Sequence, residues 1–384
     1  MKGREPPPPL AAILAKVTRP ECLVDLDRAR ANATRMAEKA RRSGVAFRPH
    51  FKTHQSAAVG EIFCDLDITG ITVSSLEMAS YFADAGFRDI TVAFPLNPRR
   101  LPELDALAGR VALGVLVDNP AAADALDGFG RPVRVWIEID SGQGRSGIPW
   151  NEPAAMVALA RHVRRVTGRP LAGLLTHAGH SYTAGSPARV REIHAETISR
   201  MTRLAGELER ADGSRPLVSV GDTPCCALAA ELSGVDEVRP GNFVFFDATQ
   251  LAIGSCAPSD LALAVACPVV GVYPARREIV LHGGAIHLSK DSLVADGERV
   301  FGLLAAPDAG GLGLPDPRSK VIALSQEHAV ARVPDPDRWR VGDVALVFPA
   351  HACLTAEMFS EYRATTGERL PRFVRQTAGS PLRG

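Results

Sequence analysis

The chain has 384 residues, of which 46% are hydrophobic and 23% charged, and its formal net charge at pH 7 is +1. These values are typical of a globular protein of more than one domain, and no dense basic patch indicates nucleic acid or an anionic membrane surface as a partner. The apolar run at 10–14 is too short for a signal peptide, and no stretch is long enough to span a membrane. With seven cysteines and no CxxC pair, we expect a cytoplasmic protein with reduced thiols.

Short apolar runs alternate with helix-like segments through the first two thirds of the chain. The longest predicted helix is 188–211, and in the segment 74–86 Ser75 can cap a helix that ends at Gly86. Eight runs with strand character end in polar or glycine-rich residues: 45–52, 71–75, 90–95, 113–118, 133–140, 171–180, 217–224 and 238–246. This alternation predicts a parallel sheet with right-handed crossovers, and eight repeats are what a (β/α)8 TIM-like barrel requires. A doubly wound sheet is the alternative.

The residues at the ends of these runs favour the barrel. They follow the carboxyl ends of different strands, and in a barrel those ends form a single rim where active sites are built. They are His50, Lys52, Asp140, Arg145, His177, His180, Gly221, Thr223 and Gly241.

After about residue 255 the pattern changes. Strand-like runs at 261–274, 277–288, 320–333 and 343–356 follow one another without long helices, and 302–320 has the composition of a Gly/Pro-rich loop. We therefore predict three parts. They are an N-terminal tail at 1–19 with a strand able to join the C-terminal domain, a (β/α)8 barrel at 20–255, and a mostly β C-terminal domain at 256–384.

The stretch RPHFKTHQS (48–56) crowds two histidines and two cations onto the end of the first strand. Neighbours that desolvate Lys52 would lower its pKa and make its amine a nucleophile for an aldehyde. Without further context, a lysine that extends its amine to solvent is the commoner explanation. The stretch closely resembles the lysine motif of fold-type III pyridoxal phosphate (PLP) enzymes, in the branch of D-threonine aldolases and D-serine dehydratases. The resemblance implies that Lys52 forms the Schiff base with PLP and that His50 lies beside the cofactor.

The resemblance covers nearly the whole chain. Its further landmarks follow in order: VWIEIDSGQGRSG (135–147), LLTHAGHSY (174–182), VSVGDTP (218–224), EVRPGNFVFFD (237–247), SQEHA (325–329) and PAHACLTA (349–356). It implies a homodimer that acts on small D-amino acids.

PLP needs a cradle for its phosphate, and backbone amides in glycine turns supply one. Gly221 with Thr223, and Gly241 with Asn242, form two such turns at neighbouring strand ends, although each turn alone is more often structural. The family usually has Ser or Thr where Asp222 stands. Because a carboxylate repels a phosphate, we expect Asp222 to point away and leave the contacts to Thr223 and the amides.

The ring nitrogen of PLP also needs a partner, and an arginine keeps it unprotonated. Arg145 and Arg239 are the candidates, and we favour Arg145, for which a salt bridge to Asp140 or Glu138 is the alternative explanation. His177 and Tyr182 can stack on the ring or bind substrate, although a histidine buried in the core for structural reasons is equally expected at 177.

His351 and Cys353 are the candidate metal ligands. Two residues apart in an extended segment, their side chains point to the same face, and imidazole with thiolate suits Zn²⁺. HxC alone is a weak signal, but the pair resembles the family's metal pair and leaves open coordination positions, as in catalytic sites. Zn²⁺ is expected, with Mn²⁺ and Mg²⁺ as alternatives. Weaker candidates are His287, Asp291, Glu327 and His328.

The resemblance implies a PLP- and metal-dependent lyase acting on a D-3-hydroxy amino acid. We favour a D-serine or D-threonine type dehydratase that forms a keto acid and ammonia. Retro-aldol cleavage to glycine and an aldehyde is the alternative. An amino-acid racemase is disfavoured because neither Tyr273 nor Tyr362 lies in a recognisable racemase motif, and a PLP-homeostasis protein is disfavoured by the C-terminal domain. The side chain of the substrate stays open, from D-serine and D-threonine to 3-hydroxy-D-aspartate and phenylserine-type compounds.

Overall fold

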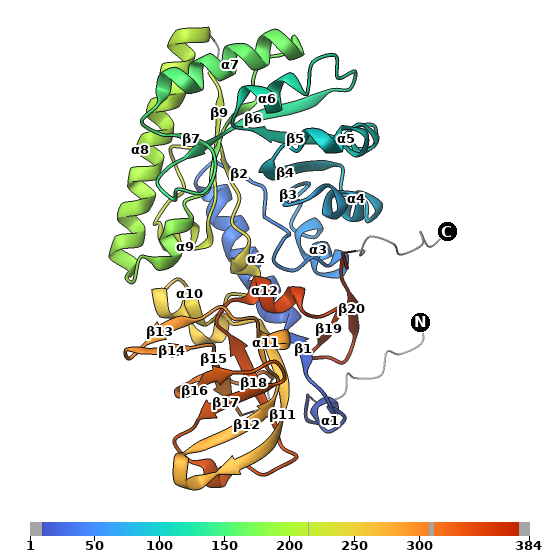
Figure 1. Cartoon of the computed structure of the whole chain (residues 1–384), viewed down its shortest axis with the longest axis vertical. Helices are drawn as coiled ribbons and strands as arrows, with labels where there is room; N and C mark the ends of the chain where they lie inside the picture. Colours follow the sequence, from blue (N-terminus) through green and yellow to red (C-terminus); the bar gives the residue numbers. More distant parts are fainter. Residues whose placement is uncertain (1–9, 214, 307–310, 376–384) are drawn as a thin grey trace.

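The computed structural model describes residues 10–213, 215–306 and 311–375, which form two domains stacked along the long axis of the molecule (Figure 1). The first nine residues of the predicted tail and residues 307–310 of the predicted loop lie outside the described residues. In the described ranges, no helix is long and apolar enough to cross a membrane.

The larger domain is built on a parallel sheet in which eight strands follow the order β2-β10-β9-β8-β6-β5-β4-β3 and the short β7 pairs with β6. A parallel bridge between His50 and Thr72 joins the segment after β2 to β3 and closes the sheet into a barrel. The predicted TIM-like barrel is therefore confirmed, and the doubly wound alternative is wrong. The strands are β2 (Ala46–Phe47), β3 (Gly70–Val73), β4 (Asp89–Pro95), β5 (Ala112–Val117), β6 (Val133–Asp140), β7 (Ile148–Pro149), β8 (Gly173–Thr176), β9 (Leu217–Val220) and β10 (Glu237–Val238).

Helices cover the outside of this barrel. In α4 the Ser75 hydroxyl accepts a hydrogen bond from the Met78 amide at 3.2 Å, and Gly86 follows the helix with φ +100°, as the cap signals predict. The helices are α2 (Leu26–Arg42), α3 (Ala57–Cys64), α4 (Leu76–Asp84), α5 (Leu101–Ala108), α6 (Pro120–Asp124), α7 (Pro153–Thr167), α8 (Pro187–Asp212), α9 (Thr223–Leu228) and α10 (Ala248–Ile253).

The second domain contains a six-stranded closed barrel, β12-β17-β16-β15-β18-β11, because β11 also pairs with β12. β1, β19 and β20 extend the sheet beyond β11, and β13 with β14 forms a separate hairpin. Its elements, with the N-terminal ones, are α1 (Leu10–Leu14), β1 (Glu21–Val24), β11 (Leu263–Tyr273), β12 (Glu278–His282), α11 (Ala285–Leu288), β13 (Leu293–Ala295), β14 (Glu298–Val300), β15 (Gly302–Ala305), β16 (Asp316–Leu324), β17 (His328–Arg332), β18 (Val344–Pro349), α12 (Ala352–Glu357), β19 (Glu361–Ala364) and β20 (Arg369–Pro371).

Two predictions about this domain need correction. The N-terminal strand that joins it is β1, at 21–24, which falls inside the range predicted for the barrel. The predicted loop at 302–320 begins with the buried strand β15, which pairs with both β16 and β18, and it ends inside β16. Pairing on both edges gives this short apolar run a strand conformation that its Gly- and Pro-rich neighbours obscured.

Candidate active site

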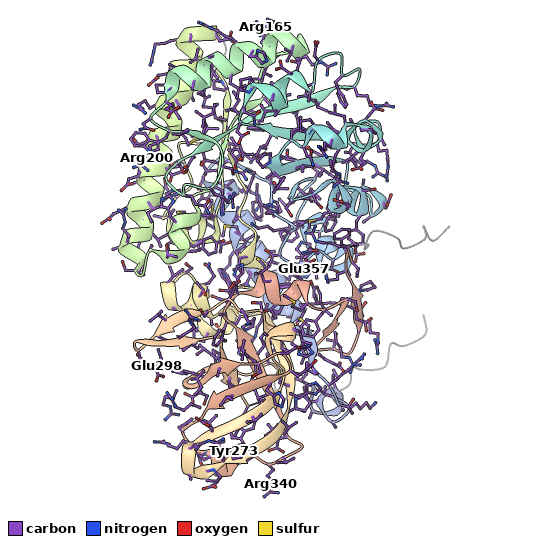
Figure 2. All side chains as sticks on the ribbon, in the orientation of Figure 1. Arg165, Arg200, Tyr273, Glu298, Arg340 and Glu357 are labelled. Atoms are coloured by element: carbon purple, nitrogen blue, oxygen red, sulfur yellow. The ribbon has the colours of Figure 1, made fainter. Side chains whose placement is uncertain are left out.

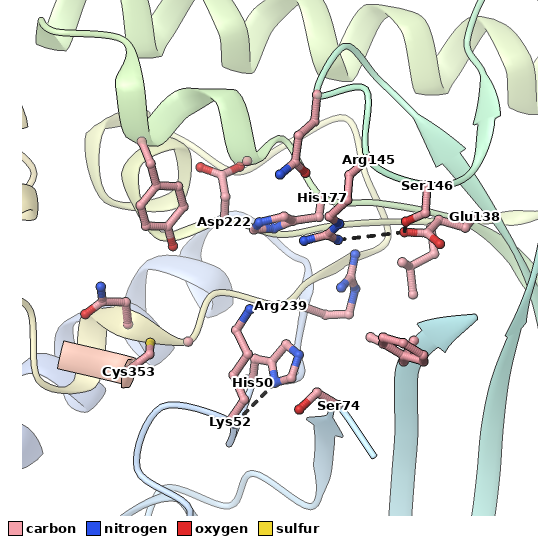
Figure 3. A pocket seen from close by; sticks show the side chains of 18 of the residues that line it. His50, Lys52, Ser74, Glu138, Arg145, Ser146, His177, Asp222, Arg239 and Cys353 are labelled. Carbon is pink, nitrogen blue, oxygen red and sulfur yellow. Dashed lines mark hydrogen bonds and ion pairs between the residues drawn. The ribbon is translucent and has the colours of Figure 1, made fainter. Parts of the chain in front are cut away.

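The carboxyl ends of the barrel strands surround a cavity of about 590 Å³ that faces α12 of the second domain (Figure 3). Ten of the predicted site residues line it, while Gly221 and Thr223 are covered by their neighbours. The ten are His50, Lys52, Arg145, His177, Tyr182, Arg239, Gly241, Asn242, His351 and Cys353.

Lys52 projects into this cavity from the segment that closes the barrel. The preceding residue, Phe51, is fully buried and packs in a cluster with Phe63, Phe82 and Phe87. This packing fixes the backbone at Lys52. Burial lowers the pKa of the Lys52 amine; the Cys353 thiolate opposes this, while the charges of two arginines act with it. The Lys52 amine therefore loses its proton more readily than the amine of an ordinary lysine.

His50 and His177 are neutral members of the cavity wall. Burial, with the charge of Lys52, holds the pKa of His50 well below its usual value, and its Nδ1 accepts a hydrogen bond from the Lys52 amide at 3.3 Å. Burial lowers the pKa of His177 to about 3, and its Nδ1 donates to the Gly221 carbonyl at 2.5 Å. The His177 ring lies 6.2 Å from that of Tyr182, whose hydroxyl accepts from the Thr223 amide at 3.4 Å.

The two glycine turns have a packing reason of their own. A Cβ on Gly221 would lie 2.8 Å from the Arg239 backbone, and a Cβ on Gly241 would lie 2.8 Å from the His50 carbonyl oxygen. Asp222 lines the cavity, so the expectation that it points away is not confirmed. Its Oδ1 caps α9 by accepting from the Cys225 amide and also accepts from the Ser181 hydroxyl, both at 2.8 Å.

The two candidate arginines differ in how they are held. Arg239 is buried, and its guanidinium donates to the Ser219 hydroxyl and the Thr176 carbonyl, each at 2.6 Å, so these donors are already used. The Arg145 side chain is 52% exposed, and its only described ion pair is a long one, 3.9 Å from Nη2 to Glu138 Oε1 (Figure 3). Arg145 therefore has donors available for a ligand.

Glu138 was considered from the sequence only as an alternative partner for Arg145. It is 4% exposed, its Oε1 accepts from the Ser146 hydroxyl at 3.0 Å, and among the described residues its Oε2 has no hydrogen-bond partner. Burial raises the pKa of this carboxyl.

The predicted metal pair lies at the start of α12, between the two domains (Figure 1). The prediction that His351 and Cys353 share an extended segment is wrong: His351 is the extended N-cap residue and Cys353 belongs to the first helical turn. Burial alone would raise the pKa of the Cys353 thiol. The charge and hydrogen bond of His351, with the Lys52 charge and the Thr53 hydrogen bond, together outweigh burial and lower this pKa. Burial would likewise lower the pKa of His351, but Cys353 and Asp247 together raise it well above its usual value.

Two residues outside the sequence prediction hold this pair. The Asp247 carboxylate accepts from His351 Nδ1 at 3.1 Å, and the Thr53 hydroxyl lies 3.2 Å from Cys353 Sγ in a hydrogen bond. Asp247 ends the quoted motif EVRPGNFVFFD, which was the available signal for it. None of the weaker candidates His287, Asp291, Glu327 and His328 lines the cavity. No group of three or more His, Cys, Asp or Glu residues within the described ranges is placed to hold a metal.

These residues fit PLP and a divalent metal. Lys52 offers a desolvated amine for the aldehyde, and Arg145 offers free guanidinium donors for a ring nitrogen. His351 uses Nδ1 for Asp247, which leaves Nε2 for a metal beside the Cys353 thiolate. The site can therefore carry covalent cofactor chemistry and Lewis-acid chemistry within one cavity.

Comparison with known proteins gives two family models. Residues 24–249 match the alanine racemase N-terminal domain, and residues 262–365 match the putative serine dehydratase domain. D-threo-3-hydroxyaspartate dehydratase of Delftia sp. (strain HT23) is 34% identical over 91% of this chain and 94% of its own length. D-serine dehydratase of Dictyostelium discoideum is 28% identical over 90% and 93%, and D-threonine aldolase of an Arthrobacter species is 28% identical over 91% and 90%.

The solved structure of the Delftia dehydratase superposes on this chain with a TM-score of 0.87 and 32% identity, over 94% of this chain and 99% of that one. Variants of D-threo-3-hydroxyaspartate dehydratase with a cysteine or a histidine replaced by alanine have also been solved, the cysteine variant in a metal-free form.

Proposed function

The chain belongs to the family of PLP-dependent D-3-hydroxy amino acid dehydratases and aldolases, and from this premise we propose that it is a metal-dependent dehydratase. One observation carries the proposal: the Lys52 amine and the pair of His351 and Cys353 line the same cavity. An amine that can hold PLP therefore faces two residues that can hold a Lewis acid, as the dehydration of a β-hydroxy amino acid requires.

Each residue has a part in this proposal. Lys52 would hold PLP through its amine and would serve as the base that takes the proton from Cα. His351 and Cys353 would hold the metal, expected to be Zn²⁺, and Arg145 would offer its guanidinium donors to the ring nitrogen. When bound, PLP withdraws electrons from Cα, and the metal polarises the β-hydroxyl as a Lewis acid. The lowered pKa values of His50 and His177 make both rings weak bases, which leaves Lys52 as the stronger base in the cavity wall.

The presence of a cysteine beside His351 supports a metal site at the start of α12. A cysteine-to-alanine variant of a D-threo-3-hydroxyaspartate dehydratase has been solved in a metal-free form, and this chain offers Cys353 beside His351 at the start of α12. A homodimer and a cytoplasmic location stay predictions.

Aldol cleavage is the second candidate, because D-threonine aldolase of Arthrobacter matches this chain over nearly its full length. Racemisation has less support. Of the tyrosines after residue 255, Tyr273 lies at the far end of the second domain (Figure 2), and Tyr362 is buried and donates its hydroxyl to the His54 carbonyl.

The decisive test is product identification after incubating the PLP- and Zn²⁺-loaded protein with D-threonine. We expect 2-oxobutanoate and ammonia in equal amounts, and no product from L-threonine as the matched control. Glycine and acetaldehyde would instead identify an aldolase. D-Serine and D-threo-3-hydroxyaspartate should be tested in parallel, because failure to convert any of the three would overturn the proposal.

A further inference from the structure

The Asp247 carboxylate accepts more hydrogen bonds than the capping of a helix requires. It is the N-cap residue of α10, and its Oδ1 accepts from the Gln250 amide at 2.9 Å, which is the ordinary capping contact. The side chain of Asp247 is fully buried, and the helix that it caps has only six residues. A buried carboxylate without compensation is strongly unfavourable, so the contacts of its second oxygen matter.

That second oxygen, Oδ2, accepts three hydrogen bonds. Asn242 Nδ2 donates at 2.5 Å, the Ala352 amide at 3.0 Å and His351 Nδ1 at 3.1 Å. Asn242 belongs to the glycine turn at the end of the last barrel strand, while His351 and Ala352 begin α12 of the second domain. One oxygen atom therefore joins the predicted phosphate turn to the predicted metal ligand.

We propose that Asp247 is a positioning residue for both cofactor sites, through its single oxygen Oδ2. This inference rests on the proposed function, since it assumes that PLP and a metal occupy the cavity. Asp247 itself does not line the cavity, so it acts through Asn242 and His351.

On the metal side, Asp247 fixes which ring nitrogen of His351 is free. Because Nδ1 carries the hydrogen and donates it in a hydrogen bond to Oδ2, Nε2 keeps its lone pair for a metal. The ring cannot turn without losing this hydrogen bond. The bond from the Ala352 amide to the same oxygen also fixes the backbone that carries His351.

On the PLP side, Asp247 fixes the turn of Gly241 and Asn242. Asn242 is 2% exposed, and this turn packs so closely on His50 that a Cβ on Gly241 has no room. A shift of Asn242 therefore displaces a turn that cannot adjust independently of the segment that carries Lys52.

The test is the Asp247→Asn variant, which keeps the shape of the side chain and the capping Oδ1 but replaces Oδ2 with an NH₂ group that cannot accept. We would measure Zn²⁺ affinity by competition with a chromogenic chelator, and PLP affinity by absorbance titration of the apoprotein. We expect Zn²⁺ to bind about 10- to 100-fold more weakly, as for other partners of metal-binding histidines. We expect PLP to bind about three- to tenfold more weakly, as for the loss of one hydrogen bond.

Asp25→Asn is the matched control, because Asp25 caps α2 by accepting from the Arg28 amide at 3.0 Å and does not line the cavity. It should leave both affinities unchanged. Unchanged affinities in Asp247→Asn, or a loss of Zn²⁺ affinity alone, would overturn the shared role. If the wild-type protein bound neither PLP nor Zn²⁺, the proposed function itself would fail, which is a different result.

A second variant covers the case in which Asp247→Asn does not fold. Asn242→Ala removes the link to the turn and leaves the Asp247 carboxylate with His351 and Ala352. We expect it to weaken PLP binding and to leave Zn²⁺ binding unchanged. Equal PLP affinity in Asn242→Ala and wild type would overturn the proposal.

Discussion

The lysine segment and the metal pair face the same cavity but are held in different ways. Lys52 is positioned by its own stretch of chain: Phe51 anchors it from below, and the His50–Thr72 bridge closes the barrel beside it. Asp247 holds His351, and Thr53 holds Cys353. The metal pair of the second domain is therefore positioned by residues of the barrel. The barrel alone thus accounts for the place of Lys52, whereas the metal pair is held by contacts between the second domain and the barrel.

This difference separates what each variant should change. A change on the lysine side should affect PLP first, and a change on the α12 side should affect the metal while PLP stays bound.

The largest effect is expected for Lys52→Ala. Without its amine the protein cannot hold PLP covalently, so the visible absorbance of the holoprotein should disappear completely. Lys39→Ala is the matched control, because Lys39 is also partly buried but donates to the carbonyls of Cys226 and Ala227 in the outer layer of the barrel. The control should keep its visible band, and a band that survives in Lys52→Ala as well would disprove the assignment.

His351→Ala should lower kcat by about 10²-fold or more, because a metal acting as a Lewis acid lowers the activation barrier by several kcal/mol. Metal analysis should show loss of bound Zn²⁺, and the visible absorbance of PLP should remain. His287→Ala is the control, since His287 lies in the same domain and outside the cavity. Loss of the PLP band in His351→Ala would mean that the two sides are not separate.

Glu138→Gln and Arg145→Gln should each lower kcat/KM by about tenfold, the order expected for a hydrogen bond to a charged group. Glu138 should act by holding Arg145 at the ring nitrogen, so the double variant should be little worse than either single one. Steady-state kinetics of the four proteins measures this coupling. Effects that multiply in the double variant would show that the two residues act independently.

The smallest effect is a dependence of stability on pH. Burial lowers the pKa of His54 to about 3, so between that value and the ordinary histidine pKa of about 6.5 only the unfolded chain takes up the proton. The unfolded state binds more protons in this window, and the free energy of unfolding should therefore fall with falling pH, by about 1–2 kcal/mol between pH 7 and pH 5.

Urea unfolding at the two pH values measures this change. His54→Asn keeps an acceptor for the Ser56 amide, which now donates to His54 Nδ1 at 3.2 Å, and it removes the titrating group. It should reduce the pH dependence by up to one proton. An unaltered dependence would mean that His54 is not buried in its neutral form.

The sequence predicts the barrel side of the molecule better than the second domain, for physical reasons. The alternation of strands and helices is a local pattern, and Ser75 and Gly86 mark helix ends by their own chemistry. The helical start of α12 is not visible in PAHACLTA, because the bond from the Ala352 amide to Asp247 comes from a residue far away in the chain. The role of Asp247 was missed for the same reason.

β1 has a consequence for how the molecule can be made. It lies in the second domain between β11 and β19, with Leu23 opposite Ala264, although it precedes the whole barrel in the chain. During synthesis this strand leaves the ribosome first and must wait, with its edges unpaired, until the barrel and β11 have followed. A single cut in the chain therefore cannot release the second domain intact. The barrel is an insertion into the smaller domain, whose sheet cannot be completed until the strands that follow the barrel have been made.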